Sequence, residues 1–351
     1  MPSRITLRDI AAQAKVHIST VSLALRNSPK LRPGMRDRIR KIADALGYTP
    51  DPGMAALVAH RKGVRAAPYQ STLAWLDNWP RHKDAIKLRD ITTFNDYYLG
   101  AAERAAQFGY KLEEFFLRAP GITPARMASI LRARNIQGII SPPQEHDSNR
   151  LDFDFADFTA VALGYSLRPA RLHVVTNHQF LSAKLLVTRL HELGYRRIGL
   201  CLCEDWDNKV NNGYTAGFDS AHRHLPDCAR IPPFLTDVVR PEELRVWMHK
   251  YTPDVIITQG ISQEMIDWFG KDFGLRVPRD IGVTNLSAHT NEPHITGILQ
   301  NDRLVGATAV DVLVGMLQRN ERGLPGIIAY TLVDGTWYPG ATVRRLSLKG
   351  R

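Results

Sequence analysis

The sequence predicts an α/β protein with two parts: a small all-α head, and a larger body with parallel sheets that is long enough for two lobes. Three observations predict this division. Apolar residues recur at helical spacing in three short stretches near the start. After residue 70, apolar runs of strand length alternate with helical stretches. Charge divides the chain too, because residues 1–65 hold thirteen basic and four acidic residues, a net +9 of the chain's +11.

The first two helices of the head are expected within residues 6–27. Thr6 is a candidate N-cap of the first, and Asp9 stands three residues later in a capping-box arrangement. Residues 15–17 form the turn, and the second helix begins near Ile18. The side chains expected to face inward are Leu7, Ile10, Ala11, Ala14, Val21 and Leu25. Those expected to face outward from the second helix are Ser19, Ser22 and Arg26.

Two helices this short bury little apolar surface, so a third is required. Residues 35–46 supply it, with Pro33 near its start and Gly47 after its end. Three small helices with a polar, cationic second helix are typical of a helix-turn-helix head. A cationic head on a nearly neutral body indicates a polyanion bound at one end only. The alternative, a helical bundle with a solvated basic face, does not explain this concentration of charge.

The head resembles that of the lactose-repressor (LacI/GalR) family of bacterial transcription regulators. The matching stretches are T-L-R-D-I-A at 6–11, V-H-I-S-T-V-S at 16–22 and I-A-D-A-L-G-Y-T-P at 42–50. The resemblance implies that double-stranded operator DNA is a partner. The positions that match DNA contacts of the family are Thr6, His17, Ile18, Ser19, Thr20, Ser22, Leu23 and Arg26. Because one head recognises a half-site only weakly, a homodimer on a two-fold operator is expected.

Leu23 stands where the family frequently has an arginine. An arginine there can hold guanine by two hydrogen bonds, whereas leucine can only touch a thymine methyl group or exclude a base. An operator different from those of arginine-bearing members is therefore expected. The alternative interpretation of Leu23 is a position in the core of the head.

Residues 51–70 are expected to join the head, residues 1–50, to the body, residues 71–351. The segment is basic and is broken by Pro52 and Gly53. The resemblance implies that a hinge helix forms here on operator DNA, and that Leu57 matches a leucine that wedges into the minor groove. The alternative is that Leu57 is an ordinary apolar linker residue.

The body is predicted to alternate strands and helices, as in parallel sheets with helices on both faces. Strands are expected at residues 71–78, 110–116, 138–142, 159–165, 197–203, 254–258 and 281–286. Helices are expected at residues 97–108, 124–134, 181–193, 214–224, 263–273 and 304–318. The resemblance continues here, for example in L-H-E-L-G-Y-R-R-I-G-L at 190–200, and implies a periplasmic-binding-protein-like body of two lobes around a cleft.

Ligands of such sheets bind where the carboxyl ends of the strands face one another. The effector-binding residues expected there are Asp77, Trp79, Phe94, Tyr165, Asn177, Tyr214, Gln259 and Ser287. This sequence departs from the family at four of them: Tyr214 replaces an arginine, Asn177 and Ser287 replace aspartates, and Gln259-Gly260 stands where the family has an Asn-Asp pair. The charge-assisted bonds of the family are therefore lost, while aromatic faces that can stack on a sugar ring remain. Two interpretations stay open, a neutral small-molecule effector such as a sugar, and a degenerate cleft without an effector.

No enzyme signature is present: the sequence has no Walker loop, no G-x-S-x-G and no H-E-x-x-H. No metal-ligand spacing is found among the histidines, and neither a cofactor nor a metal is expected. A sugar-binding protein or sugar enzyme on the same two-lobe fold is the alternative of another class. The cationic head and the start without an apolar signal-peptide core argue against it.

The compartment is expected to be the cytoplasm. No stretch offers about 18 consecutive apolar residues, so no membrane partner is expected. The three cysteines, Cys201, Cys203 and Cys228, are too few for a disulfide framework and fit buried thiols. The sequence thus predicts a cytoplasmic transcription regulator that acts as a repressor.

Overall fold

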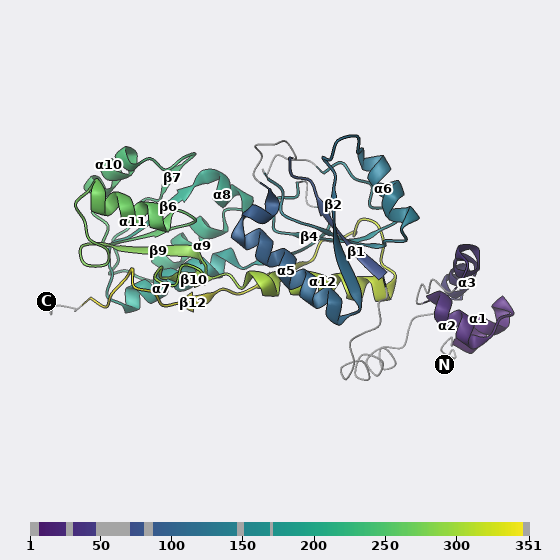
Figure 1. Ribbon diagram of the computed structural model, residues 1–351. Coiled ribbons are helices and arrows are strands. Elements are labelled where there is room, and N and C mark those ends of the chain that lie inside the picture. Colours follow the sequence, from purple (N-terminus) through teal and green to yellow (C-terminus); the bar gives the residue numbers. More distant parts are fainter. Residues whose placement is uncertain are drawn as a thin grey trace.

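The computed structural model of the protein describes residues 7–25, 31–46, 71–80, 87–145, 151–168 and 171–346. The predicted fold class is confirmed: a small helical head precedes two α/β lobes, each built on its own sheet (Figure 1). Among the helices in these ranges, none is both long and apolar enough to cross a membrane.

The head consists of α1 (Leu7–Ala14), α2 (Ile18–Leu25) and α3 (Pro33–Ala45). Its core contains the predicted Ile10 and Val21 together with Ile39 of α3, none of which is exposed to solvent. One expectation was wrong in part: Ala24 is fully buried on α2, and Leu25 is only half-buried. Ala24 lies three residues after Val21 and takes the fully buried position, while Leu25 packs against the same core and remains partly accessible.

The N-terminal lobe (N-lobe) contains a six-stranded parallel sheet in the order β11-β5-β4-β3-β1-β2. Its strands are β1 (Ser71–Asp77), β2 (Tyr110–Phe116), β3 (Gly138–Ser141), β4 (Thr159–Leu163), β5 (His173–Asn177) and β11 (Tyr330–Val333). Its helices are α5 (Thr92–Gln107), α6 (Pro124–Ala133) and α12 (Asp302–Arg319), with a 3₁₀ turn, η1 (Leu88–Asp90). Alternate residues of β1 serve both faces: Leu73 and Trp75 pack with α5 and α12, whereas Ala74 and Leu76 pack with α6.

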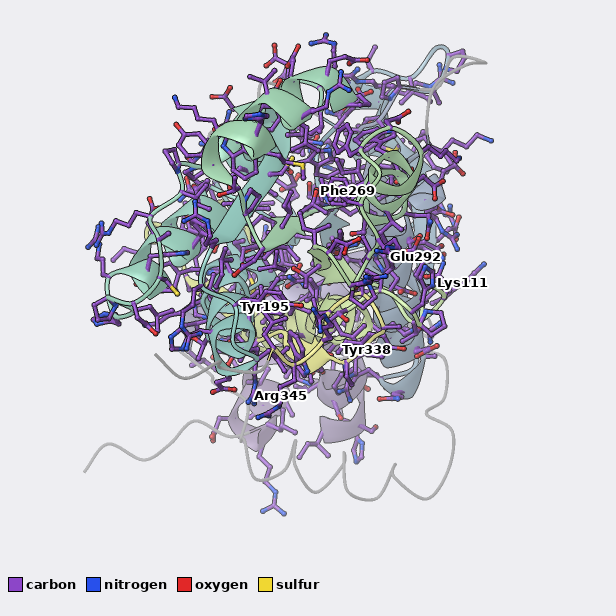
Figure 2. The ribbon with its side chains drawn as sticks, turned by 90° about the vertical axis from the view of Figure 1, so that its left-hand side faces the viewer. Lys111, Tyr195, Phe269, Glu292, Tyr338 and Arg345 are labelled. Atoms are coloured by element: carbon purple, nitrogen blue, oxygen red, sulfur yellow. The ribbon has the colours of Figure 1, made fainter. Side chains whose placement is uncertain are left out.

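The C-terminal lobe (C-lobe) contains a sheet in the order β12-β10-β9-β8-β6-β7, in which only the pair of β10 and β12 is antiparallel among its described pairs. Its strands are β6 (Ile198–Cys203), β7 (Phe234–Thr236), β8 (Val255–Thr258), β9 (Gly282–Ala288), β10 (Gly297–Leu299) and β12 (Thr336–Tyr338). Its helices are α7 (Gln179–Glu192), α8 (Glu204–Lys209), α9 (Gly213–His222), α10 (Pro241–Tyr251) and α11 (Ser262–Lys271). In the view of Figure 2, Phe269 of α11 lies among the inner side chains of this lobe, and Lys111 of the N-lobe extends outward.

The chain passes between the two lobes three times in the described part. The passages follow β5, β10 and β11, so each lobe contains segments from distant parts of the sequence. Hydrogen bonds join the passages: the His178 N–H donates to the Val333 carbonyl at 2.8 Å, and Asn301 Nδ2 donates to the Asp334 carbonyl at 2.8 Å. These bonds hold the passages side by side.

Candidate DNA-binding and ligand-binding sites

His17 fixes the start of α2, the helix expected to read DNA. Its Nδ1 lies 2.7 Å from the Ser19 hydroxyl, and the Ser19 N–H donates to it at 3.3 Å. The His17 carbonyl accepts the first backbone bond of the helix, from the Thr20 N–H at 2.8 Å. His17 and Ser19 are both exposed, so the N-terminal end of α2 faces solvent.

The remaining predicted DNA contacts on α2 are partly accessible. Thr20, Ser22 and Leu23 are half-buried, and Ile18 is half-buried against the core of the head. In the described part of the head, Leu23 does not belong to the apolar side chains that pack against this core. This placement favours an outward role for Leu23 over the core position. Thr6, Arg26 and Leu57 lie outside the described residues.

A cavity of about 80 Å³ lies between the lobes, and we name it the interlobe cavity. Of the eight predicted effector-binding residues, six line it: Phe94, Tyr165, Asn177, Tyr214, Gln259 and Ser287. They come from both lobes and include the carboxyl ends of β5 and β8 and the last part of β9. Tyr165, Asn177, Gln259 and Ser287 reach the cavity at or near the carboxyl ends of strands, whereas Phe94 and Tyr214 reach it from α5 and α9.

Asp77 and Trp79 do not line this cavity. They stand behind its wall, where Asp77 Oδ1 accepts the Trp79 N–H at 2.7 Å. Trp79 Nε1 in turn donates to the carbonyl of Pro143, a lining residue, at 2.8 Å, and the Trp79 ring meets Phe94 edge to face at 5.9 Å. Both side chains support the wall because their polar atoms find partners within the N-lobe.

The floor of the interlobe cavity is a hydrogen-bonded network around Asn177. Its Oδ1 accepts the Tyr97 hydroxyl, and its Nδ2 donates to the Gln300 carbonyl at 2.7 Å and to Asp302 Oδ1 at 3.1 Å. The Gln300 side chain donates to the Leu286 carbonyl. Asp302 was missed in the sequence, although an acid two residues after Gln300 was a detectable signal.

Asp302 is the electrostatically unusual group of this floor. The pKa of its carboxyl group is raised to about 7: burial is the chief cause and the nearby Asp96 adds to it, while hydrogen bonds to Asn177 and Thr93 act in the opposite direction. Burial also raises the pKa of the Tyr97 and Tyr214 hydroxyls. The two tyrosines therefore remain neutral donors at any physiological pH.

The short helix α8 of the C-lobe reaches across to the N-lobe. The ring of Trp206 lies 6.5 Å from that of Phe94. Lys209 Nζ lies 4.6 Å from the centre of the Trp206 ring and 5.8 Å from that of Trp79, as in cation–π contacts. Both α8 residues line the interlobe cavity. They were not predicted there, because the sequence pattern of residues 204–209 indicates no helix or strand.

Three polar side chains at this cavity keep unused hydrogen-bonding capacity. Within the described part of the chain, no hydrogen bond is formed by the Tyr214 hydroxyl, the Gln259 amide or the Ser287 hydroxyl. Aromatic faces from Phe94, Tyr165 and Trp206 stand around them. Neutral donors and acceptors beside aromatic rings suit a ring-shaped ligand that carries hydroxyl groups.

One cluster outside the cavity resembles a metal site. The ligand atoms of His191, Asp227 and Cys228 lie within 4.8 Å of one another. However, Arg196 Nε lies 2.7 Å from the Asp227 carboxylate, and burial raises the pKa of the Cys228 thiol to about 11. A metal would require the thiolate and would face the guanidinium cation, so the cluster is better explained as an ion pair beside a buried thiol.

A basic helix-turn-helix head joined to a two-lobe body with a cavity between the lobes is the architecture of a class of DNA-binding regulators. Residues 6–51 match the bacterial regulatory proteins of the lacI family, and residues 187–336 match the periplasmic binding protein-like domain. The chain is 45% identical over 339 residues to the HTH-type transcriptional repressor CytR of Escherichia coli K12, with 91% of each chain covered. The chain belongs to the lacI family of bacterial regulatory proteins.

Solved structures agree on the fold. The complex of the transcriptional regulator CelR with cellobiose matches with a TM-score of 0.57 at 17% identity, covering 97% of this chain and 100% of that one. The lac repressor dimer bound to operator and the anti-inducer ONPF matches with a TM-score of 0.55 at 18% identity and the same coverage. Family membership makes the chain a DNA-binding transcription regulator and not an enzyme.

Proposed function

We propose that the protein represses transcription in the cytoplasm as a homodimer on a two-fold operator, and that a small neutral ligand, such as a sugar, regulates it. The observation that carries the regulatory part is the interlobe cavity at the passages between the lobes. The relative CytR is named a repressor, and the lac repressor structure is a dimer on operator. Sedimentation that finds only monomer at micromolar concentration would contradict the dimer.

A ligand in this cavity would contact both lobes at once. Phe94 and Tyr165 belong to the N-lobe, and Gln259 and Ser287 belong to the C-lobe. A ligand shifts a conformational equilibrium only through its different affinity for the two states. Contacts on both sides supply that difference, because a change in the angle between the lobes moves one set of partners relative to the other.

The volume of the interlobe cavity helps to decide whether the protein binds an effector at all. About 80 Å³ is well below the roughly 300–1,000 Å³ of most small-molecule sites. Ligand entry therefore requires the lobes to move apart, with α8 carrying Trp206 away from Phe94. The small volume favours the effector-free alternative, whereas the unused groups of Tyr214, Gln259 and Ser287 favour a polar ligand.

A thermal-shift screen of neutral sugars against the full-length protein separates these two functions. A ligand at a hundred times its Kd stabilises the folded state by about 2.7 kcal/mol, so Tm rises. The shift should shrink in Ser287→Ala, which removes one unused hydroxyl, and should persist in Ser129→Ala, a serine exposed on α6. Unchanged Tm for every neutral sugar tested at millimolar concentration would favour the cleft without an effector.

Operator choice is predicted to depend on three residues of α2. Exchanging Ile18, Ser19 and Leu23 together should change the sequence that the protein selects from a random duplex pool, because these positions match the base contacts of the family. Replacing the exposed Gln13 on α1 should leave the selected sequence as it is. An identical consensus from the triple variant would refute the assignment of these residues to base contact.

Leu57, outside the described residues, is proposed as a wedge in the minor groove. Leu57→Ala should weaken operator binding by a few kcal/mol, on the scale of the base-step unstacking that such a wedge supports. Binding to random duplex should change little, because the cations of the head still meet phosphate. Titrations of both duplexes at several salt concentrations measure the contrast, and equal behaviour of variant and parent would make Leu57 an ordinary linker residue.

A further inference from the structure

A second cavity opens beside the interlobe cavity and is larger, at about 170 Å³. We name it the arginine pocket and define it by Tyr165, Arg168, Arg171, Asn211 and Tyr330. Gly164 and Tyr165 line both cavities, so the Tyr165 ring stands at their boundary. At ~30 Å³ per water molecule, the pocket has room for roughly five waters or for one hydrated small anion.

The two arginines of the pocket are exposed to solvent, and no acidic partner for them is found among the residues that the structure describes. None of its described lining residues is an acid. In the part of the chain that the structure describes, neither Arg168 nor Arg171 forms an ion pair with a carboxylate; Arg168 Nη2 donates to the Asn208 carbonyl at 3.2 Å. Two guanidinium groups with planar, forked donors suit a tetrahedral oxyanion, which can accept several charge-assisted hydrogen bonds at once.

The arginine pocket draws its donors from both lobes. Both arginines and both tyrosines belong to the N-lobe, whereas Asn211 follows α8 of the C-lobe. Asn211 adopts a left-handed conformation with a φ of 58°, and its exposed side-chain amide forms no hydrogen bond in the described part of the chain. The bond from Arg168 to Asn208 already crosses between the lobes at this point.

The aromatic wall of the arginine pocket adds neutral donors. The rings of Tyr165 and Tyr330 stack with their centres 5.8 Å apart and an angle of 30° between their planes. Burial raises the pKa of the Tyr165 hydroxyl, so this group stays protonated and can donate to an anion. The Tyr165 hydroxyl can therefore donate a hydrogen bond to the same anion that the two arginines would bind.

We propose that the arginine pocket binds a phosphoryl dianion, which fastens the two lobes together through Arg171 on one side and Asn211 on the other. Two sources share this chemistry. One is inorganic phosphate, which does not depend on the sugar effector proposed above. The other is the phosphoryl end of a larger ligand whose remainder passes Tyr165 into the interlobe cavity, and this form rests on the proposed effector function.

The test titrates the full-length protein with sodium phosphate at constant ionic strength, following Tm and heat of binding. Saturable binding is expected for the parent, with at least a tenfold loss of affinity in Arg171→Gln. Arg223→Gln makes the same change of charge at an exposed position on the C-lobe and should bind as the parent does. The proposal is overturned if the parent shows no saturable response, or if Arg171→Gln responds as the parent does.

Two further comparisons test whether the anion joins the two lobes, and whether it is free phosphate or the phosphoryl end of a larger ligand. Asn211→Ala should also weaken phosphate binding, and parental affinity in this variant would confine the anion to the N-lobe and contradict the fastening. Glucose 6-phosphate that binds more tightly than phosphate supports a larger ligand, and equal affinities support the free anion. Glucose without effect in the same assay would count against the neutral effector and would leave the anion site standing.

Discussion

Replacing Gly306 by alanine is expected to lower the free energy of unfolding by about 3 kcal/mol or more, on the scale of severe overpacking in a core. A Cβ atom at this position of α12 would lie 1.9 Å from the Tyr97 carbonyl oxygen of α5. At the same crossing, a Cβ on Gly100 would lie 1.9 Å from the Arg303 carbonyl oxygen. The obstacles are backbone atoms, so relief requires the two helices, which run side by side in Figure 1, to move apart.

The matched control for this substitution is Gly315→Ala in the same helix. A Cβ there would meet only the flexible end of Arg319, at 3.2 Å. Alanine also favours helix over glycine by up to ~1 kcal/mol, so this variant should be as stable as the parent or slightly more stable. Urea unfolding of both variants measures the difference. If the urea midpoint of Gly306→Ala equals that of the parent, then α5 and α12 do not need their close approach.

The crossing of α5 and α12 is connected to the interlobe cavity through Tyr97. The same residue presents its carbonyl oxygen to Gly306 and its hydroxyl to Asn177 in the floor of the interlobe cavity. Separation of α5 from α12 would therefore move a cavity residue as well as open the N-lobe core. A partly folded Gly306→Ala variant should lose the ligand response before it loses binding to random DNA, since α12 lies in the body.

Strong periodicity made most of the fold predictable from sequence. The strand at 110–116 agrees residue for residue with β2, and the helices α6, α7, α9 and α11 lie within a few residues of their predicted bounds. Helix α5 begins at Thr92, five residues before the expected Tyr97, because its first turn is largely polar. Strands β10 and β12 have three residues each, too few for a pattern, and pairing across the sheet creates them.

The candidate ligand site was predictable where it follows strand ends and unpredictable where it depends on contact between lobes. Gln259 directly follows the strand predicted at 254–258, so the topology alone places it. Asn177 ends β5, a strand that the sequence analysis did not predict, and only the family resemblance places it. Trp206 and Lys209 reach the cavity only because α8 crosses to Phe94 and Trp79. The sequence likewise cannot show that Trp79 turns into the wall to reach the Pro143 carbonyl.

Asp302→Asn is expected to raise the stability of the body at pH 8 by up to roughly 4 kcal/mol. The carboxyl group has an ordinary pKa of 3.8 and a folded-state pKa of about 7, raised chiefly by burial. Between these values the folded state keeps a proton that the unfolded state releases, so stability falls as pH rises through this window. At about 1.4 kcal/mol per pH unit the loss approaches 4 kcal/mol above pH 7 and vanishes below pH 4.

The asparagine removes this dependence without removing the local hydrogen bond. Its Oδ1 can still accept the Asn177 Nδ2 donor, which lies 3.1 Å from Asp302 Oδ1 in the parent. Urea unfolding at pH 5 and pH 8 should show a larger gain over the parent at pH 8, where the parent must keep a carboxylate near Asp96 in the buried floor. Asp237→Asn, at an exposed position, should show little difference at either pH. An equal gain for Asp302→Asn at both pH values would mean that the carboxyl group does not titrate in this window.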